Sequence, residues 1–452
     1  MNKLLEKAKN ISVEFLESIN DRRVYPDEES LQLLKMFSEE LPLNPSDPEE
    51  VISHLHKYGS SSAVASAGGR YFGFVIGSSL PASLAANWIS TAWDQNAGLG
   101  VTSPVNAVIE TITSSWLTEI LPVAPNSTAG FVTGVTMANF CGLASARHHL
   151  LTKLGWNVEA DGLFNAPPVN VVVGEEAHGS LLKALSLVGF GYNRVTKVAV
   201  DNQGRMIASD FPEVDENTIV CLQAGNVNTG SFDPAKEIIP IVKKKGAWVH
   251  VDGAFGLWAG ASKKYSHLTR GIEDADSWAT DAHKWLNVPY DSGIVFVRDA
   301  ESLRAAMSMT GNYLDQSGER VPFQYTPELS RRARAIEIWA GMRSLGKNGI
   351  SHLIEQTCAH ASKFAIELQN AGYEILNDVV INQVLVSFGD DVLTRKIVEE
   401  IQKNGTCWMG LTNFQGKTAM RISVSSWATT DEDVDKSLSA IICIAKKCSN
   451  KS

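Results

Sequence analysis

The spacing of apolar residues changes along the chain and divides it into parts. Residues 1 to about 60 carry apolar side chains at helical spacing, interrupted at "VYPDEES" and "LPLNPSDPEE". From about residue 61, continuous apolar runs such as "VNVVV" and "TIVCLQ" alternate with helical stretches. Continuous apolar strands are typical of a sheet covered by helices on both faces, so this region predicts a mostly parallel α/β sheet.

The last third of the chain has a mixed pattern. A helical stretch, "HLIEQTCAHASKFAIELQNAG", is followed by the strand-like runs "NQVLVSFG" and "AMRISVSSW". We therefore expect an N-terminal helical segment at 1–60 that packs on a partner subunit. A large domain at 61–325 and a smaller C-terminal α+β domain at 326–452 are expected to follow.

Composition and charge narrow the range of partners. The net charge of -10 argues against nucleic acid or an anionic membrane as the main partner. No apolar run reaches the length that spans a bilayer, and "MNKLLEKAKNISVEFLESIN" lacks the apolar centre of a signal peptide. The six cysteines form no CxxC pair, so neither a disulfide framework nor a metal site is indicated. We expect a cytoplasmic protein with free thiols.

Four loops that follow apolar strands carry polar groups, and such loops meet at one edge of a parallel sheet. In "FVTGVTMANF", Thr133, Gly134 and Thr136 lie at the start of a helix. Backbone N–H groups there suit a phosphate, although an ordinary capped helix would show the same residues. In "GEEAHGSLL", His178 opens a helix, a position where a histidine is often only a capping residue.

The other two loops contain a carboxylate and a lysine in apolar surroundings. In "HVDGAFG", Asp252 ends an apolar strand; a carboxylate there needs a cation or a donor, or else caps a helix. "DAHKWLNVP" carries Asp281, His283 and Lys284. Lys284 either lays its stem over Trp285 with its ammonium group in water or serves as a reactive amine.

Together these groups match what pyridoxal 5′-phosphate (PLP) requires. A lysine forms a Schiff base with its aldehyde, and a carboxylate keeps the pyridine nitrogen protonated so that the ring can accept an electron pair. A histidine can stack on the ring, and a helix start can hold the phosphate.

The pair "HVDGAFG" and "DAHKWLN", some thirty residues apart, resembles the group II PLP-dependent amino acid decarboxylases. That family includes glutamate, aromatic amino acid, tyrosine and diaminobutyrate decarboxylases. The stretches "DRRVYP", "TSPVNAVIETITSSWL", "GNVNTGSFDP" and "SRRARAIEIWAGMRSLG" follow in family order. The resemblance implies a fold-type-I PLP-dependent transferase-like large domain, a smaller C-terminal domain, and a homodimer with active sites at the interface.

The resemblance also implies roles for individual residues. Lys284 would form the Schiff base, Asp252 would partner the pyridine nitrogen, and His178 would stack on the ring and approach the substrate carboxylate. Asp281 would lie near the cofactor. The residues at the phosphate would be Gly134, Val135, Thr136 and His283.

Two further positions bear on the chemistry. Tyr313, in "TGNYLDQ", corresponds to a loop tyrosine that protonates the substrate carbon after carbon dioxide leaves; otherwise it is simply an aromatic residue on a polar loop. Relatives with phenylalanine there tend toward aldehyde formation. Met137 replaces the glutamate that is usual in the family's phosphate loop, which changes the local contacts of the cofactor.

The substrate pocket is the least defined part of the site. Phe74, Val75 and Trp93 match segments that line the pocket in relatives and favour an aromatic or other apolar substrate. Arg70 could instead bind a distal carboxylate, which leaves glutamate or aspartate open.

The leading hypothesis is α-decarboxylation of an L-amino acid to its amine. The alternatives are an aminotransferase, a carbon–carbon lyase or an aldehyde synthase on the same fold, and Arg421 in "MRISVSS" would suit more than one of them. A non-catalytic PLP-binding protein has only Met137 in its favour.

Overall fold

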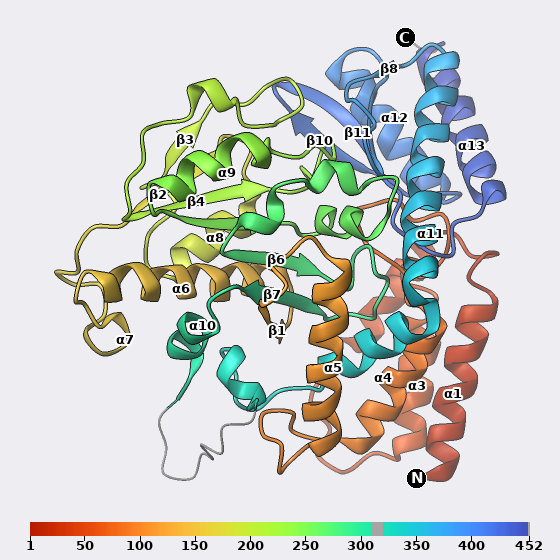
Figure 1. Cartoon of the computed structure of the whole chain (residues 1–452). Helices are drawn as coiled ribbons and strands as arrows, with labels where there is room; N and C mark the ends of the chain where they lie inside the picture. Colours follow the sequence, from red (N-terminus) through yellow and green to blue (C-terminus); the bar gives the residue numbers. More distant parts are fainter. Residues whose placement is uncertain (310–319, 451–452) are drawn as a thin grey trace. The chain divides into compact units, whose positions relative to one another are not determined.

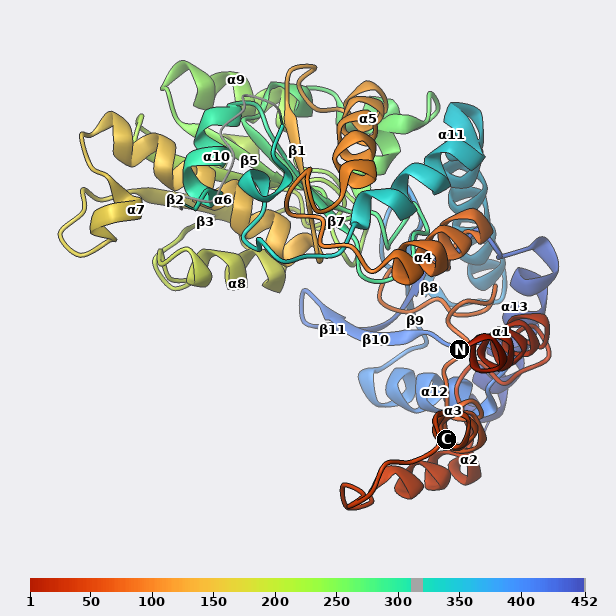
Figure 2. The same cartoon turned by 90° about the horizontal axis from the view of Figure 1, so that it is seen from below.

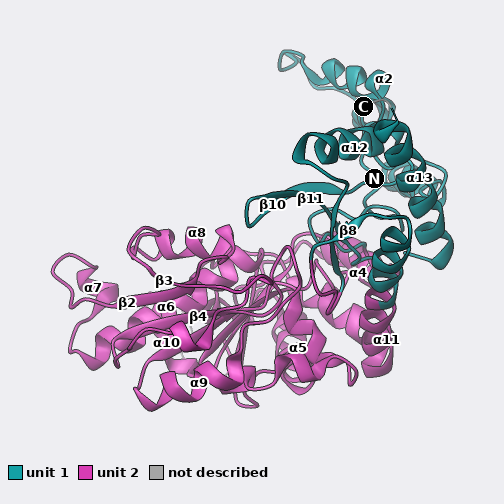
Figure 3. Cartoon of the chain, turned by 90° about the horizontal axis from the view of Figure 1, so that it is seen from above, with its two compact units in different colours: residues 1–78, 359–376, 382–452 teal, residues 79–358, 377–381 magenta. Residues whose placement is uncertain are grey.

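The computed structural model describes residues 1–309 and 320–450. The chain forms two compact units, coloured separately in Figure 3. Unit 1 comprises Met1–Ser78, Ala359–Leu376 and Asn382–Ser452, and unit 2 comprises Ser79–Cys358 and Asn377–Ile381. The three-part division expected from the sequence stays a prediction.

Unit 2 is built on a seven-stranded sheet with the order β1-β7-β6-β5-β4-β2-β3 (Figure 1). Neighbouring strands from β3 to β6 run parallel, and β7 is antiparallel to both β6 and β1. The mostly parallel sheet is therefore confirmed, with β7 as the exception. The strands are β1 (Thr128–Val132), β2 (Asn170–Gly174), β3 (Thr196–Val198), β4 (Thr218–Gln223), β5 (Trp248–Asp252), β6 (Ser277–Asp281) and β7 (Gly293–Val297).

Helices cover both faces of this sheet, as its continuous apolar strands require. α8 and α9 lie on opposite faces (Figures 2 and 3). The α-helices are α4 (Pro81–Trp93), α5 (Pro104–Ile120), α6 (Val135–Lys153), α7 (Val158–Asp161), α8 (Gly179–Leu187), α9 (Ala235–Lys244), α10 (Ala300–Met307) and the first part of α11 (Arg334–Asn370). Short 3-10 helices are η2 (Ala208–Asp210), η3 (Gly256–Ala261), η4 (Ser266–Thr269), η5 (Ile272–Asp274) and η6 (Pro322–Tyr325).

Unit 1 combines N-terminal and C-terminal segments around a four-stranded antiparallel sheet, β10-β11-β9-β8. β9 and β11 are the two strands expected from "NQVLVSFG" and "AMRISVSSW". The strands are β8 (Glu374–Ile375), β9 (Gln383–Ser387), β10 (Gly410–Phe414) and β11 (Lys417–Ser423). The helices are α1 (Asn2–Glu17), α2 (Glu28–Leu33), η1 (Leu34–Phe37), α3 (Pro48–Gly59), α12 (Asp391–Asn404), α13 (Asp431–Ser449) and the last part of α11.

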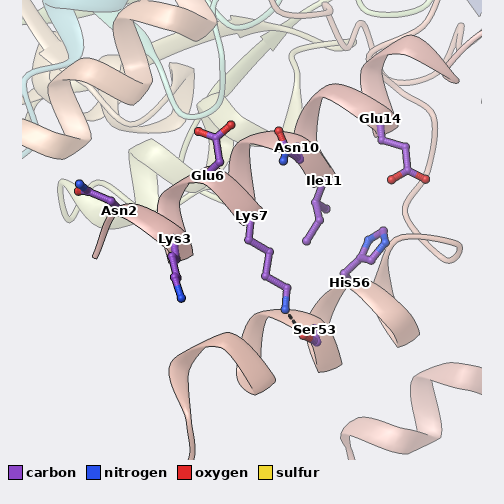
Figure 4. A pocket seen from close by; sticks show the side chains of 9 residues that line it. All are labelled: Asn2, Lys3, Glu6, Lys7, Asn10, Ile11, Glu14, Ser53 and His56. Atoms are coloured by element: carbon purple, nitrogen blue, oxygen red, sulfur yellow. Dashed lines mark hydrogen bonds between the residues drawn. The ribbon is translucent and has the colours of Figure 1, made fainter.

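An open groove of about 730 Å³ lies between α1 and α3 (Figure 4). Lys7 of α1 reaches across it and donates a hydrogen bond to the hydroxyl of Ser53. The groove contains none of the residues expected at the cofactor, since it is lined by Asn2, Lys3, Glu6, Lys7, Asn10, Ile11, Glu14, Ser53 and His56.

Among the helices that the structure describes, none is both long and apolar enough to cross a membrane.

Candidate active site

The carboxyl ends of β1, β2, β5 and β6 lie at the same edge of the sheet of unit 2, because these strands run in one direction. Each end leads directly into one of the four polar loops (Figure 1). Gly134 follows β1, His178 follows β2, Asp252 ends β5, and Asp281 ends β6 three residues before Lys284. The sheet order therefore brings together loops that are up to 150 positions apart in the chain.

Asp281 connects two of these loops. Its carboxylate accepts a hydrogen bond from the backbone N–H of Val135 at 2.6 Å, and its other oxygen lies 3.0 Å from Nζ of Lys284. The Asp281 side chain is almost fully buried, and the Lys284 side chain is 17% exposed. The carboxylate thus holds the start of α6 beside the lysine and leaves the lysine accessible.

His283 is fixed by contacts on both sides of its ring. The backbone N–H of Ser292 donates to Nδ1 at 3.0 Å, which places the proton of the neutral ring on Nε2, 3.6 Å from Asp281. The ring stacks on Tyr290 with 4.3 Å between centroids. Burial lowers the pKa of His283, although Asp281 opposes this shift, so a neutral donor is available next to the start of α6.

Asp252 is a buried carboxylate, 3% exposed, whose hydrogen bonds come from neutral groups. Asn139 Nδ2 donates to it at 3.1 Å, and the backbone N–H of Ala254 donates at 3.2 Å. Burial raises the pKa of Asp252, while the nearby charges of His178 and Lys284 lower it. A carboxylate buried in this way favours a cationic partner, and the protonated nitrogen of PLP would supply one.

Sequence reasoning did not identify Asn139. Its signal was present, because asparagine is a poor helix former and it occupies the second turn of a helix whose neighbours are apolar or small. Its partner Asp252 lies 113 positions away, so only the fold could pair them.

His178, which the sequence predicts at the cofactor, is the cap of a helix. It is the N-cap of α8, where the backbone N–H of Ser180 donates to its Nδ1 at 3.2 Å and the Ser180 hydroxyl lies 2.7 Å away. The capping alternative that the sequence left open is therefore observed. Capping fixes the ring, and the electrostatic influence of His178 on Asp252 places it near that carboxylate.

The start of α6 is the candidate phosphate cradle. Gly134, Val135 and Thr136 form its first turn, and a 19-residue helix places the positive end of its dipole there. The loop packs closely on β7, since a Cβ atom at Gly293 would lie 2.4 Å from Cα of Gly134. Met137 is half-buried and packs against the apolar core of unit 2.

We expect Gly293→Ala to displace this cradle. The added methyl would overlap the backbone at Gly134, and overpacking of this kind costs about 1–3 kcal/mol. Titration with PLP should show weaker binding and thermal unfolding a lower Tm. In the control variant Gly100→Ala the methyl would meet only Ala107, at 3.9 Å, and binding should be unchanged. Equal PLP affinity in both variants would contradict the close packing of Gly293 on Gly134.

The residues expected in the substrate pocket differ in exposure and belong to both units. In unit 1, Phe74 is 60% exposed, whereas the neighbouring Val75 is buried. Both have left-handed backbone conformations, with φ of 54° and 58°, which non-glycine residues adopt at a cost and which often occur at functional sites. Trp93 ends α4 in unit 2 and is 48% exposed.

Arg70 is occupied within unit 1. It is buried, and its guanidinium donates to the backbone oxygens of Thr406 and Asn20 and lies 3.5 Å from Asp433. These contacts leave it no role toward a distal carboxylate of the substrate, which corrects that alternative. Arg421 lies on β11, where burial lowers its pKa. Tyr313 lies outside the described residues.

Comparison with known proteins identifies the family. The model of the pyridoxal-dependent decarboxylase conserved domain matches residues 31–389. An aromatic-L-amino-acid decarboxylase of Bacillus atrophaeus is 25% identical over 481 residues, covering 99% of this chain and 96% of that protein. An acidic amino acid decarboxylase of Xenopus tropicalis is 29% identical over 395 residues, covering 83% and 74%.

The fold is likewise that of known decarboxylase structures. The crystal structure of Oryza sativa TDC with PLP and tryptamine superposes with a TM-score of 0.91 at 20% identity, covering 99% of this chain and 97% of that chain. The chain therefore belongs to the pyridoxal-dependent decarboxylase family, in its group II branch. It is a PLP-dependent amino acid decarboxylase with a fold-type-I architecture.

Proposed function

We propose that this enzyme removes the α-carboxylate of an L-amino acid with an apolar or aromatic side chain, with Lys284 as the lysine that binds the cofactor. The observation that carries this proposal is the convergence of Lys284, paired with Asp281, and the buried Asp252 at one edge of the sheet. PLP supplies the electron sink that accepts the electron pair left when carbon dioxide departs.

The remaining roles follow from the contacts of each residue. Asp252 would hold a proton on the ring nitrogen of bound PLP, because the charge pair would relieve the cost of burying the carboxylate. His178, held by Ser180, presents its ring beside that carboxylate. Asp281 lies 3.0 Å from Lys284 Nζ and holds the lysine side chain at the edge of the sheet.

The first turn of α6 would hold the phosphate of the cofactor. This turn consists of Gly134, Val135 and Thr136. Asp281 contacts both the backbone N–H of Val135 and the ring of His283, so His283 lies next to the start of the helix. Tyr313 stays a prediction of the sequence as the residue that protonates the substrate carbon.

The proposed substrate class rests on the resemblance, in which Phe74 lines the substrate pocket, and in unit 1 Phe74 belongs to an aromatic cluster. The Trp408 ring stacks on Tyr71 with 5.0 Å between centroids and lies 5.5 Å from the ring of Phe74. Phe74 is the exposed member and offers an apolar surface. Arg70, which the sequence offered as a residue to bind the distal carboxylate of an acidic substrate, donates hydrogen bonds to backbone oxygens instead.

The test is carbon dioxide release from a panel of the common L-amino acids, using protein supplied with PLP. We expect release from aromatic or large apolar substrates and not from glutamate or aspartate. Release from the acidic amino acids alone would contradict the proposed substrate class. Keto acid formation without carbon dioxide would indicate transamination, and aldehyde with ammonia would indicate an aldehyde synthase.

Phe74→Ala should lower kcat/KM for the preferred substrate by about tenfold, because hydrophobic pocket contacts of this size contribute about 1–3 kcal/mol. Steady-state kinetics would measure this effect. The matched control is Phe164→Ala, which removes a phenylalanine that is 89% exposed in unit 2. Similar values for both variants would remove Phe74 from the substrate pocket.

The proposal includes a homodimer. The outer faces of α4 and α5 carry exposed apolar side chains, whereas their inner residues Ala86 and Ile109 pack against the cluster of Ala97, Ala333 and Ile336. Exposed apolar groups in such number indicate a covered surface. They are Trp88, Ile89, Trp93, Val108 and Ile112.

Placing charges on this surface should separate the subunits. We expect light scattering to give twice the chain mass of 49.1 kDa for the unmodified protein and the single mass for the double variant Ile89→Glu, Val108→Glu. The control Val392→Glu, at an exposed apolar position on α12, should remain dimeric. A dimeric double variant would rule out α4 and α5 as the interface.

A cytoplasmic location is supported by the thiols. The six cysteines all lie within the described residues, none is in a disulfide bond and five are buried, which is typical of a reducing compartment.

A further inference from the structure

A continuous line of buried hydrogen bonds leads to Asp252. Trp248 Nε1 lies 2.9 Å from Ser277 Oγ, which lies 2.8 Å from His250 Nδ1; His250 Nε2 lies 2.9 Å from Asn139 Oδ1. Asn139 Nδ2 then donates to Asp252 at 3.1 Å. At most 3% of each of these residues is exposed.

The sequence places these groups on one face of the sheet. Successive side chains of a strand alternate between faces, so Trp248, His250 and Asp252 of β5 all point toward α6. Gly142 of α6 admits the histidine, because a Cβ atom there would lie 2.7 Å from the His250 ring. Glycine weakens a helix interior, and the close approach of this ring accounts for its presence.

The direction of the line is fixed at its carboxylate end, because an ionised Asp252 can only accept and takes the Asn139 amino group as its donor. Asn139 Oδ1 therefore faces His250 Nε2 and accepts its N–H, which leaves Nδ1 of the neutral ring to accept from the Ser277 hydroxyl. That hydroxyl in turn accepts from the indole N–H of Trp248, which can only donate. Burial lowers the pKa of His250 to about 3, so the neutral ring has a single N–H, on Nε2. That N–H donates to Asn139 Oδ1, which leaves the Asn139 amino group for the carboxylate.

The opposite arrangement is unfavourable at both ends. With the proton on Nδ1, the lone pair of His250 Nε2 would face a lone pair of Asn139 Oδ1. Only a 180° rotation of the Asn139 amide would avoid this repulsion. A turned amide would direct its oxygen at the carboxylate of Asp252, and two acceptors would then repel each other.

We propose that His250 is a positioning residue, which acts through Asn139 to hold Asp252 ionised and directed at the nitrogen of the cofactor ring. This inference rests on the proposed role of Asp252. The other titratable groups that act on Asp252 are His178 before α8, Lys284 and Asp281 at the end of β6, and Cys221 on β4. None of these four belongs to the line from Trp248 to Asn139.

The test compares His250→Leu, which removes the donor, with His250→Gln, which keeps an N–H that can reach Asn139. Protein loaded with ¹⁵N-labelled PLP reports directly, by the ¹⁵N chemical shift, whether the ring nitrogen carries a proton. We expect this shift to move toward neutral pyridine in His250→Leu and to return toward the original value in His250→Gln. The expected fall in kcat for His250→Leu is about tenfold, with KM little changed, as for other partners that act through a neighbour.

Ser277→Ala provides a second variant if His250→Leu does not fold. It removes one hydroxyl, frees the histidine to exchange its proton between the two nitrogens, and should move the ¹⁵N shift in the same direction by a smaller amount. Folded variants whose ¹⁵N shift and kcat both equal those of the unmodified protein would overturn the positioning role.

A failure of the underlying function would look different. A neutral ring nitrogen in the unmodified protein, or full turnover in Asp252→Asn, would remove the role of Asp252 itself. Unchanged His250 variants beside an inactive Asp252→Asn would remove only the positioning role.

Discussion

Replacing Lys284 by alanine is expected to abolish both turnover and covalent attachment of PLP. Lys284 is the amine next to Asp281 at the edge of the sheet where the four polar loops meet. Without it, the cofactor loses its covalent link and the nearby group that transfers protons, so carbon dioxide release should fall by at least about 10³-fold. Borohydride reduction followed by mass spectrometry should show added cofactor mass in the unmodified protein only.

The control for this variant is Lys183→Ala, which removes an exposed lysine on the nearby helix α8. It should retain turnover and the added mass. Carbon dioxide release at the unmodified rate in Lys284→Ala would contradict the whole assignment, and added mass there would mean that another lysine binds the cofactor.

Replacing Asp252 by asparagine is expected to reduce turnover by about 10²–10³-fold, the range typical of losing one preorganised electrostatic partner. An amide has the shape of the carboxylate but cannot stabilise a proton on the ring nitrogen. Because the change conserves volume, the ligand-free variant should unfold within a few degrees of the unmodified protein. Turnover and differential scanning fluorimetry, with and without PLP, would measure the two effects.

The pH dependence of stability gives Asp252 a separate signature. Burial raises its pKa in the folded, ligand-free protein, so the folded state holds this proton more tightly than the unfolded state. Its contribution to stability is therefore present below the ordinary aspartate pKa of about 3.9 and is lost as the pH rises through the raised value. As the pH rises through the raised pKa of Asp252, ligand-free Asp252→Asn should gain stability relative to the unmodified protein. Parallel curves of stability against pH for the two proteins would show that burial does not raise this pKa.

At neutral pH, bound PLP should reverse this difference in stability between the unmodified protein and Asp252→Asn. The cationic ring nitrogen compensates the buried carboxylate, so PLP should raise the Tm of the unmodified protein more than that of Asp252→Asn. An equal rise would show that the cofactor does not contact Asp252.

The sequence determined the architecture of the sheet and the kind of chemistry at its edge. Continuous apolar runs require cover on both faces, and this requirement is local enough to be seen in "VNVVV" and "TIVCLQ". The pair "HVDGAFG" and "DAHKWLN" combines a carboxylate and a lysine at strand ends, where a parallel sheet collects its ligands. These features depend on residue type and short spacing, which the sequence shows directly.

Only the tertiary structure decided which side chains are partners. Asn139 is paired with His250 and Asp252 across 111 and 113 positions, and Val135 with Asp281 across 146. Such pairs depend on strand order and on the face that each helix covers, neither of which is fixed by the spacing along one segment.

The same limit applies to the residues considered for the substrate. Phe74 and Val75 are adjacent and apolar, yet Phe74 is exposed and Val75 is buried, and both have left-handed backbone that the sequence did not predict. The guanidinium of Arg70 donates to backbone oxygens that lie up to 336 positions away in the chain. Whether a charged side chain is free depends on which groups the fold brings within hydrogen-bonding distance, and that information exists only once the chain has folded.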